Sequence, residues 1–286
     1  MLSGSGLLRL LVLTTLLLSA CEKDIAWPLE NLTEDYIVVD GTITSETKIQ
    51  EIRLLKPALN PNDGPVTVND AGILVSTDDK VYSFNEDISR PGYYLSDEAF
   101  AGKPGKTYSL FINRNNTIIS AKSIMMPAAD FDFLRYVRQG GTKLFRIVWV
   151  ANPYNAKRPA MYEILLDWSA VPGYENMDPL ETRARLLYYT LPTLDVSQIF
   201  APAMEAVLFP PGTVITEKRY SLSASHAEYI RALLAETNWQ GGLFNSAPAS
   251  LPTNLSGNGI GYFGACAITT KTEIARNIFP QAENAE

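Results

Sequence analysis

Short apolar runs alternate with turn residues along the chain from Tyr36 onward. The runs are rich in β-branched and aromatic residues, and Asn, Asp, Pro or Gly stand between them, as in strands joined by turns. In the first half of the chain, predicted strands fall at residues 37–39, 52–54, 73–75, 81–84, 108–112 and 117–119. Such a series predicts a β-sandwich of about seven strands, of Ig-like or transthyretin-like form, over residues 36–126.

The second half adds further strands and the one strong helix. Alternation gives each predicted strand one buried and one wet face, at residues 144–150, 161–166, 186–191, 218–222 and about 267–274. The helix, expected at about 225–236, carries an apolar stripe made by Tyr229, Ile230, Leu233 and Leu234. Ser225 opens a segment with capping-box spacing, and Ser223 is an alternative cap. We therefore expect a mainly β chain, with a second β-rich domain at 127–276 and a tail at 277–286.

The first residues have the layout of a bacterial export signal. Arg9 is followed by an apolar run at 10–18, which is shorter than the roughly 20 residues that span a membrane. Leu18-Ser19-Ala20-Cys21 resembles the bacterial lipobox, in which the cysteine is lipidated and the chain is cleaved before it. This predicts a signal peptide at 1–20, lipid on Cys21 and a tether at 21–35. An ordinary signal peptide and a short transmembrane anchor are the less favoured alternatives.

Composition narrows the chemistry. A net charge of −7 with 19% charged residues provides no basic footprint for nucleic acid. With Cys21 lipidated, Cys266 is the single free thiol, so an intrachain disulfide is excluded. Cys266 lies in an apolar stretch, which favours a small buried side chain over a nucleophile.

Candidate catalytic groups are few. His226 is the sole histidine, and its place in the first helical turn favours a solvated or cap-adjacent role. One histidine and one free cysteine exclude zinc held by several nitrogen and sulfur ligands, and no Gly-x-Ser-x-Gly segment precedes His226.

The acidic residues give little more. Asp130 with Asp132, or Asp78 with Asp79, are pairs of the kind that glycosidases use, although Asp78 and Asp79 more simply close a hairpin. Asp178 or Glu181 alone do not make a calcium loop. We therefore expect no enzyme activity, no cofactor and no metal site.

Aromatic residues point to binding. Large aromatic side chains are common in contacts with carbohydrate, peptide and protein; here they include Trp149, Trp168, Trp239, Tyr188, Tyr189, Tyr262 and Phe263. Most are expected in the core, Trp149 in particular. Trp239, Tyr262 and Phe263 lie next to glycines and remain weak candidates for ligand contact.

Several segments resemble successive blocks of one family. They are Tyr36 to Gly41, Pro65 to Ala71, Gly92 to Tyr94, Gly105 to Tyr108, Leu222-Ser223, Gly241 to Phe244, Pro252 to Asn254 and Gly261 to Ala265. In this order they resemble the Bacteroidota lipoproteins of domain of unknown function 4249. The resemblance implies no established activity. It implies an accessory protein associated with TonB-dependent outer-membrane receptors.

Two functional hypotheses follow. The first is a lipid-anchored outer-membrane protein that partners a TonB-dependent receptor in nutrient uptake and captures an unidentified small ligand, peptide or glycan. The second is an independent surface adhesin or glycan-binding module. Glu22-Lys23-Asp24 is similar in part to signals that send such lipoproteins to the cell surface, so we favour surface exposure over the periplasmic face.

Replacing Cys21 with Ala tests the anchor. The variant has no thiol to lipidate, so we expect it to leave the membrane fraction and to appear in the soluble fraction, as measured by fractionation and immunoblotting. Cys266→Ala, which removes the other cysteine, should stay with the membrane. Retention of Cys21→Ala on membranes would contradict the lipid anchor.

Overall fold

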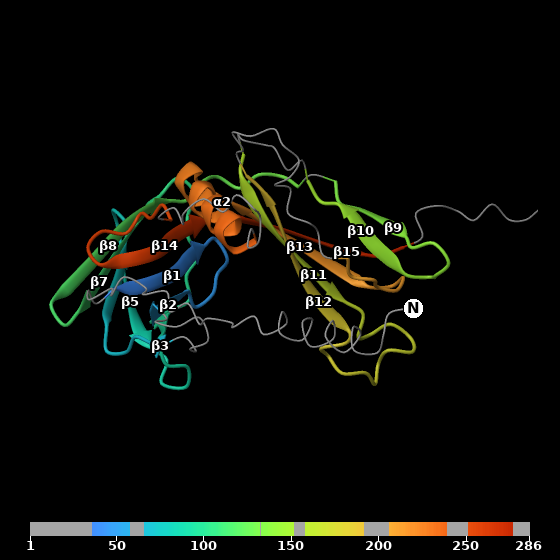
Figure 1. Ribbon diagram of the computed structural model, residues 1–286, viewed down its shortest axis with the longest axis horizontal. Coiled ribbons are helices and arrows are strands. Elements are labelled where there is room, and N and C mark those ends of the chain that lie inside the picture. Colours follow the sequence, from blue (N-terminus) through green and yellow to red (C-terminus); the bar gives the residue numbers. More distant parts are fainter. Residues whose placement is uncertain are drawn as a thin grey trace, which may run out of the picture. The chain divides into compact units, whose positions relative to one another are not determined.

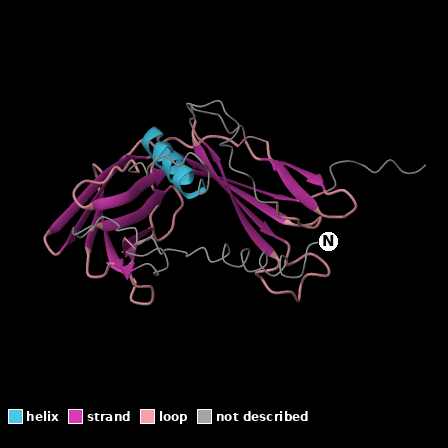
Figure 2. Cartoon of the chain, viewed as in Figure 1, coloured by secondary structure: helices cyan, strands magenta, loops and turns pink. Residues whose placement is uncertain are grey.

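The computed structural model describes residues 36–57, 66–131, 133–151, 158–191, 206–238 and 251–276. All of them lie in the compact unit Glu34–Glu286. Strands dominate this part of the chain, and α2 (Ala224–Asn238) is its helix (Figures 1 and 2). No helix among the described residues is long and apolar enough to cross a membrane. The expected mainly β fold with one main helix is confirmed.

The first sheet takes most of its strands from the first half of the chain. Its nine strands run in the order β14-β1-β2-β6-β5-β4-β7-β8, and β3 pairs with β2. The strands are β1 (Ile37–Thr44), β2 (Glu51–Lys56), β3 (Val66–Thr67), β4 (Gly72–Ser76), β5 (Val81–Glu86), β6 (Tyr93–Ser96), β7 (Thr107–Arg114), β8 (Thr117–Ile124) and β14 (Gly259–Cys266).

This sheet is nearly closed. β14 pairs in parallel with β1, and residues just before β14 reach β8 at the opposite end of the strand order. The amide of Asn254 donates to the carbonyl oxygens of Lys122 in β8 and Phe263 in β14, at 3.0 and 2.8 Å. Alternate side chains point inward and form one apolar core, which includes Ile43 and Phe263. Closure matters because it pairs strand edges that would otherwise be open.

A second sheet and a hairpin enclose another core. The sheet has the order β12-β11-β13-β15, and the hairpin pairs β10 with β9. Their strands are β9 (Arg135–Arg138), β10 (Phe145–Trp149), β11 (Ala160–Asp167), β12 (Arg183–Thr190), β13 (Val214–Ser221) and β15 (Ile268–Ile274). Tyr136 and Phe145 of the hairpin share an apolar cluster with Ile164 and Ile215 of the sheet. The hairpin therefore covers one face of the second sheet.

A single residue separates strands of the two sheets. β14 ends at Cys266 and β15 begins at Ile268, so Ala267 is where the chain passes from the first sheet to the second. Ala267 is fully buried, and its carbonyl accepts a hydrogen bond of 2.9 Å from the amide of Ser221 at the end of β13. Ser45, next to the end of β1, accepts a bond of 2.8 Å on its hydroxyl from the amide of Ile268.

The strand pairing differs from a simple division of the chain at residue 126. All the strands expected in residues 36–126 lie in the first sheet, but β14, which falls within 127–276, lies there too. No strand was expected at β14, because glycines within a segment weaken a strand pattern. The hairpin strand β9 was also missed, since it is only four residues long.

Two local expectations are corrected. Trp149 was expected in the core, but a register shift between Ile147 and Trp149 leaves its side chain 43% exposed. A β-bulge of this kind re-aims the side chains that follow it. Trp168 is buried as expected. The helix begins one residue earlier than predicted, and Ser223, the alternative cap, is the one that the structure uses.

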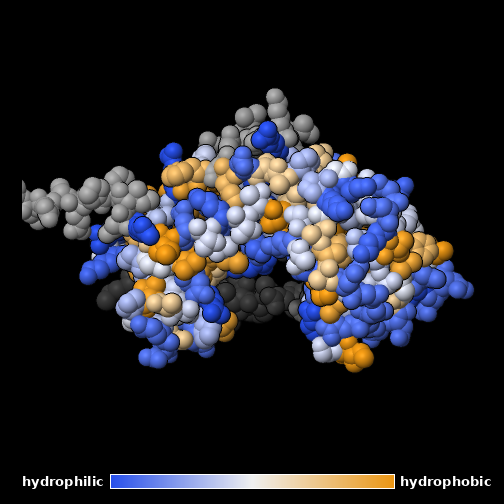
Figure 3. Space-filling view, turned by 180° about the vertical axis from the view of Figure 1, so that it is seen from behind, coloured by the Kyte–Doolittle hydropathy of each residue, from blue (hydrophilic) through white to orange (hydrophobic). Residues whose placement is uncertain are grey.

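The surface carries both hydrophilic and hydrophobic side chains. Seen from behind, the molecule is largely hydrophilic, with hydrophobic residues gathered in small groups (Figure 3). Such small groups are normal on soluble surfaces and need a further observation before they indicate a site.

Gly261 gives a test of the β1–β14 pairing. It has a φ of 95°, and a Cβ atom there would lie 2.4 Å from the carbonyl oxygen of Val39. We expect Gly261→Ala to lower the free energy of unfolding by about 2 kcal/mol or more, because it adds left-handed strain and a backbone clash. Gly140→Ala is the control, since nothing lies within 4 Å of its added Cβ. Chemical denaturation showing equal stability for both variants would contradict the pairing.

Candidate functional site

The first turn of α2 rests on β14. Ser223 caps the helix, because its hydroxyl accepts a bond of 3.3 Å from the amide of His226. The amide of Ala227 donates to the carbonyl of Ser223 at 2.9 Å, which is the first bond of the helical ladder. The cap thus sets where the helix begins and carries His226 onto the strand. Gly264 makes room for it, since a Cβ atom there would lie 2.6 Å from Cε1 of His226.

Tyr262 forms the centre of this contact. Its ring stacks on His226 at 4.5 Å between centroids and on Tyr229 at 5.1 Å. Its hydroxyl lies 2.8 Å from the hydroxyl of Ser225. Tyr262 is only 6% exposed, so little of its surface is left for a ligand.

The other candidates for ligand contact do not join Tyr262 in a site. Phe263 is fully buried in the core of the first sheet and presents no surface to a ligand. Trp239 lies outside the described residues. The candidate patch proposed from the sequence is therefore not assembled among the residues that the structure describes.

His226 and Cys266 face one another beneath the helix. The thiol sulfur lies 3.7 Å from Nδ1 of His226. Burial raises the pKa of Cys266 to about 12 and lowers the pKa of His226 to about 4. Both groups are therefore neutral near pH 7, and this pair does not supply the thiolate that nucleophilic catalysis requires. The expectation that Cys266 is a small buried side chain is confirmed, and His226 lies next to the cap with its side chain only partly exposed.

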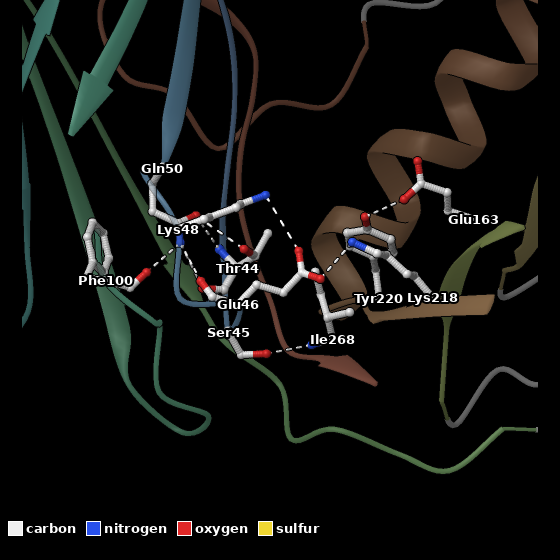
Figure 4. Close-up of polar contacts among 10 residues, drawn as sticks. All are labelled: Thr44, Ser45, Glu46, Lys48, Gln50, Phe100, Glu163, Lys218, Tyr220 and Ile268. Atoms are coloured by element: carbon white, nitrogen blue, oxygen red, sulfur yellow. Dashed lines mark hydrogen bonds and ion pairs between the residues drawn. The ribbon is translucent and has the colours of Figure 1, made fainter. Parts of the chain in front are cut away.

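A polar contact joins the first sheet to the second (Figure 4). Nζ of Lys218 in β13 donates to Oε1 of Glu46, in the connection between β1 and β2, at 2.7 Å. Buried Gln50 holds that connection in place: its amide donates to the carbonyls of Phe100 and Glu46, at 2.8 and 3.1 Å, and its Oε1 accepts from the amide of Thr44 at 3.0 Å. The Glu46 carboxylate is thus presented to Lys218 on a backbone fixed by a fully bonded side chain.

A second acid lies on the same face of the second sheet. The carboxylate of Glu163 in β11 accepts bonds from Nε of Arg185 at 2.5 Å and from the hydroxyl of Tyr220 at 2.8 Å. Burial opposes ionisation of Glu163, but the bonds from Arg185 and Tyr220 outweigh it and hold its pKa below the ordinary value. Burial, together with the Glu163 carboxylate, raises the pKa of Tyr220. Glu163 is therefore an ionised structural partner and not a proton donor at neutral pH.

Glu217 is the buried acid of the opposite face. It is 1% exposed, and neither carboxylate oxygen has a hydrogen-bond partner among the described residues. Its nearest cation is Lys271 in β15, with Nζ at 3.7 Å, and Lys271 lies closer to Glu273, at 3.0 Å. Burial raises the pKa of Glu217 to about 7 against the opposing effect of Lys271. Alternation alone did not single out this residue, because a glutamate in a strand is ordinarily assigned to the wet face.

The acidic pair of Asp78 and Asp79 has a structural role. Asp78 and Asp79 lie in the turn between β4 and β5, where the amide of Thr77 bonds to the carbonyl of Lys80 at 2.8 Å. A hydrogen bond from Lys106 lowers the pKa of Asp78. These two acids thus close a hairpin, as expected.

The remaining acids show no shared site. Asp130 is exposed, and Asp132 lies outside the described residues. Asp178 bonds to the backbone amide of Leu180, at 2.8 Å, within its own turn. Among the described residues, no group of three or more His, Cys, Asp or Glu side chains is placed to hold a metal ion.

Comparison with known proteins gives one match. A family model described as "Domain of unknown function (DUF4249)" matches residues 22–272. No curated protein matches the chain.

Glu217 predicts an unusual dependence of stability on pH. The pKa of about 7 in the folded state exceeds the ordinary 4.5, so the folded chain keeps a proton that the unfolded chain releases. The contribution of Glu217 to the free energy of unfolding should therefore fall as the pH rises from about 4.5 to 7, whereas His226, whose folded pKa of about 4 lies below its ordinary 6.5, contributes an opposing rise over an overlapping range. Glu217→Gln removes the contribution of Glu217 alone, so its free energy of unfolding relative to that of the unmodified chain should rise by on the order of 3 kcal/mol across that range in denaturant titrations.

Glu228→Gln is the matched control, because Glu228 is exposed on α2. It should keep the pH profile of the unmodified chain. An identical pH profile for Glu217→Gln and the unmodified chain would show that Glu217 is not the responsible group.

Proposed function

This chain belongs to the family of domain of unknown function DUF4249, and we propose that it is a non-enzymatic, lipid-anchored outer-membrane protein. In this role it captures a ligand for a TonB-dependent receptor or closes over the mouth of the receptor channel. The observation that carries the proposal is the lipobox-like sequence ending at Cys21. The family match begins at the next residue, so the leader lies outside the matched domain and the lipidated cysteine would be its first neighbour.

The surroundings of the candidate catalytic groups favour binding over catalysis. Cys266 and His226 are both held neutral by burial, and Glu163 is engaged by Arg185 and Tyr220. General acid–base catalysis needs a group whose pKa lies near the working pH and which reaches the substrate. Glu217 meets the first condition but is 1% exposed. The burial and hydrogen bonds of these residues indicate structural roles. We therefore assign contacts with a ligand or a receptor to surface residues.

The family resemblance supports the receptor partnership. The partial export signal Glu22-Lys23-Asp24 supports exposure on the cell surface over the periplasmic face. Lipid attachment supports such a role physically. Each buried methylene of an acyl chain contributes roughly 0.8 kcal/mol, so two or three chains hold a protein durably at a membrane. Confinement to the membrane raises the effective concentration of the chain near any receptor in the same membrane.

Affinity purification tests the partnership. A chain tagged after residue 276, isolated from gently solubilised outer membranes, should recover a TonB-dependent receptor that mass spectrometry identifies. The tagged Cys21→Ala chain, mixed in after lysis, controls for association formed during extraction. Recovery of the anchored chain without any receptor would contradict the proposal and would favour an independent adhesin or glycan-binding module, whose binding should not change when the receptor gene is deleted.

A further inference from the structure

The outward face of the β9–β10 hairpin takes no part in the packing on the second sheet. Its inward residues, which include Tyr136 and Phe145, pack on the second sheet. The outward residues alternate with the inward ones along the chain. The bulge in β10 leaves two consecutive residues, Val148 and Trp149, on the outward side. We call this surface the hairpin face; it consists of Phe133, Arg135, Val137, Arg146, Val148 and Trp149.

Large apolar side chains are exposed on the hairpin face. Phe133 is 67% exposed, Trp149 43%, Val137 39% and Val148 37%. The strand register places Trp149 opposite Arg135 and Arg146 opposite Val137. The bulge that turns Trp149 outward is a local feature that leaves the inward packing of Ile147 intact. An exposed tryptophan beside arginines is the composition typical of contact surfaces.

The charge of this hairpin is opposite to that of the chain. Residues 133–151 hold four cations and no acid, namely Arg135, Arg138, Lys143 and Arg146, whereas the whole chain has a net charge of −7. Within the described part of the chain, none of these four forms an ion pair. Several cations elsewhere pair with acids, as in Lys80 with Glu98 at 2.5 Å and Arg183 with Asp167 at 2.9 Å. Residues 133–151 therefore carry a local excess of positive charge.

We infer that the hairpin face binds the anionic headgroups of a lipid surface. Arg135 and Arg146 of the hairpin face, with Lys143 in the adjoining exposed turn, complement lipid phosphates, and each such cation near an anionic bilayer raises affinity about fivefold. Tryptophan settles at the boundary between headgroups and acyl chains because its ring is apolar and its N–H is polar. Phe133, Val137 and Val148 supply the apolar surface that this boundary accepts. The inference stands on the hairpin alone, without the receptor partnership or the lipid on Cys21.

The same face fits an acidic glycan or polypeptide less well. Sugar hydroxyls and peptide groups need several polar partners that fix their orientation. The hairpin face offers only arginine side chains and the indole N–H for this purpose, since the remaining members are Phe and Val. Charge together with smooth apolar area matches a lipid headgroup layer more closely than a hydrogen-bonded polymer.

Vesicle binding tests this inference with the full chain. Binding is measured by co-sedimentation, at low salt, with vesicles of phosphatidylcholine alone and of phosphatidylcholine mixed with phosphatidylglycerol. The quantity compared is the ratio of the two partition coefficients, because any leader or lipid on the chain contributes to both. Net charge alone predicts repulsion from the anionic vesicles, whereas the hairpin face predicts a preference for them.

Two charge-matched variants locate the effect. The hairpin variant carries Arg135→Gln, Lys143→Gln and Arg146→Gln, and retains Arg138 because its Nε bonds to the carbonyl of Thr142 in the turn. The control variant carries Lys48→Gln, Lys103→Gln and Lys122→Gln, three exposed lysines of the first sheet and its connections. The hairpin variant should lower the partition ratio by at least about tenfold, and the control by less than about threefold.

Trp149 adds a readout that does not depend on charge. Binding to anionic vesicles should shift the tryptophan emission to shorter wavelength, and Trp149→Phe should remove most of that shift. Three outcomes would overturn the inference: no preference of the unmodified chain for anionic vesicles, equal losses in both charge variants, or an unchanged shift in Trp149→Phe. Binding to polyglutamate beads without binding to anionic vesicles would also overturn it and assign the face to an acidic polypeptide.

Discussion

The passage of the chain through Ala267 is the constraint on which the rest of the fold depends. β14 closes the first sheet against β1, and one residue later β15 forms the edge of the second sheet. Ala267 packs in the core of the first sheet and bonds to Ser221 of the second, so unfolding of one sheet removes a buried contact or a hydrogen bond that the other uses. Ser45 adds to this coupling, since its amide and hydroxyl bond to the backbone at Cys266 and Ile268.

Helix α2 and the polar contacts fit around that passage. The helix follows β13 directly and packs through Ala227 and Ile230 on residues of both sheets, including Cys266 and Tyr220. His226 and Thr42 approach β14 so closely that only glycine fits at position 264. The partly buried pair of Lys218 with Glu46 contributes little energy by itself, about 1 kcal/mol or less, as is usual for ion pairs near solvent. Its geometry nevertheless follows from the buried bonds of Gln50.

The sequence was informative where a strand obeys simple alternation. Ile37, Ile52 and Leu110 lie in strands that the pattern predicts, and all three are buried. It was uninformative about β14, because the glycines of that strand are required by close contacts with groups distant in the chain. These groups are the carbonyl of Val39 and the ring of His226. Trp149 was placed on the wrong side because a bulge inverts the alternation, and no residue type announces a bulge. The sequence alone excluded an intrachain disulfide and a zinc site with several histidine and cysteine ligands, because these exclusions depend only on the numbers of His and Cys residues.

The candidate site also combines features that are visible in the local sequence with features that depend on the fold. Burial of Tyr262 and Phe263 depends on which strand lies beside β14 and on where the helix starts, and neither is a local property. The positive charge of residues 133–151 was visible in the sequence, but its exposure beside Trp149 required the hairpin. The lipobox-like sequence at Cys21 is local and lies outside the described residues, so the anchor rests on the sequence.

Hydrogen exchange measured across a denaturant series tests most directly whether the Ala267 passage makes the two sheets one cooperative structure. Amides of β1 and of β11 lie in different sheets, and each is paired on both sides. The account predicts that the slowest amides of both strands exchange through one global opening, with the same free energy and the same dependence on denaturant. Exchange of β11 at a clearly lower free energy, while β1 stays protected, would contradict it.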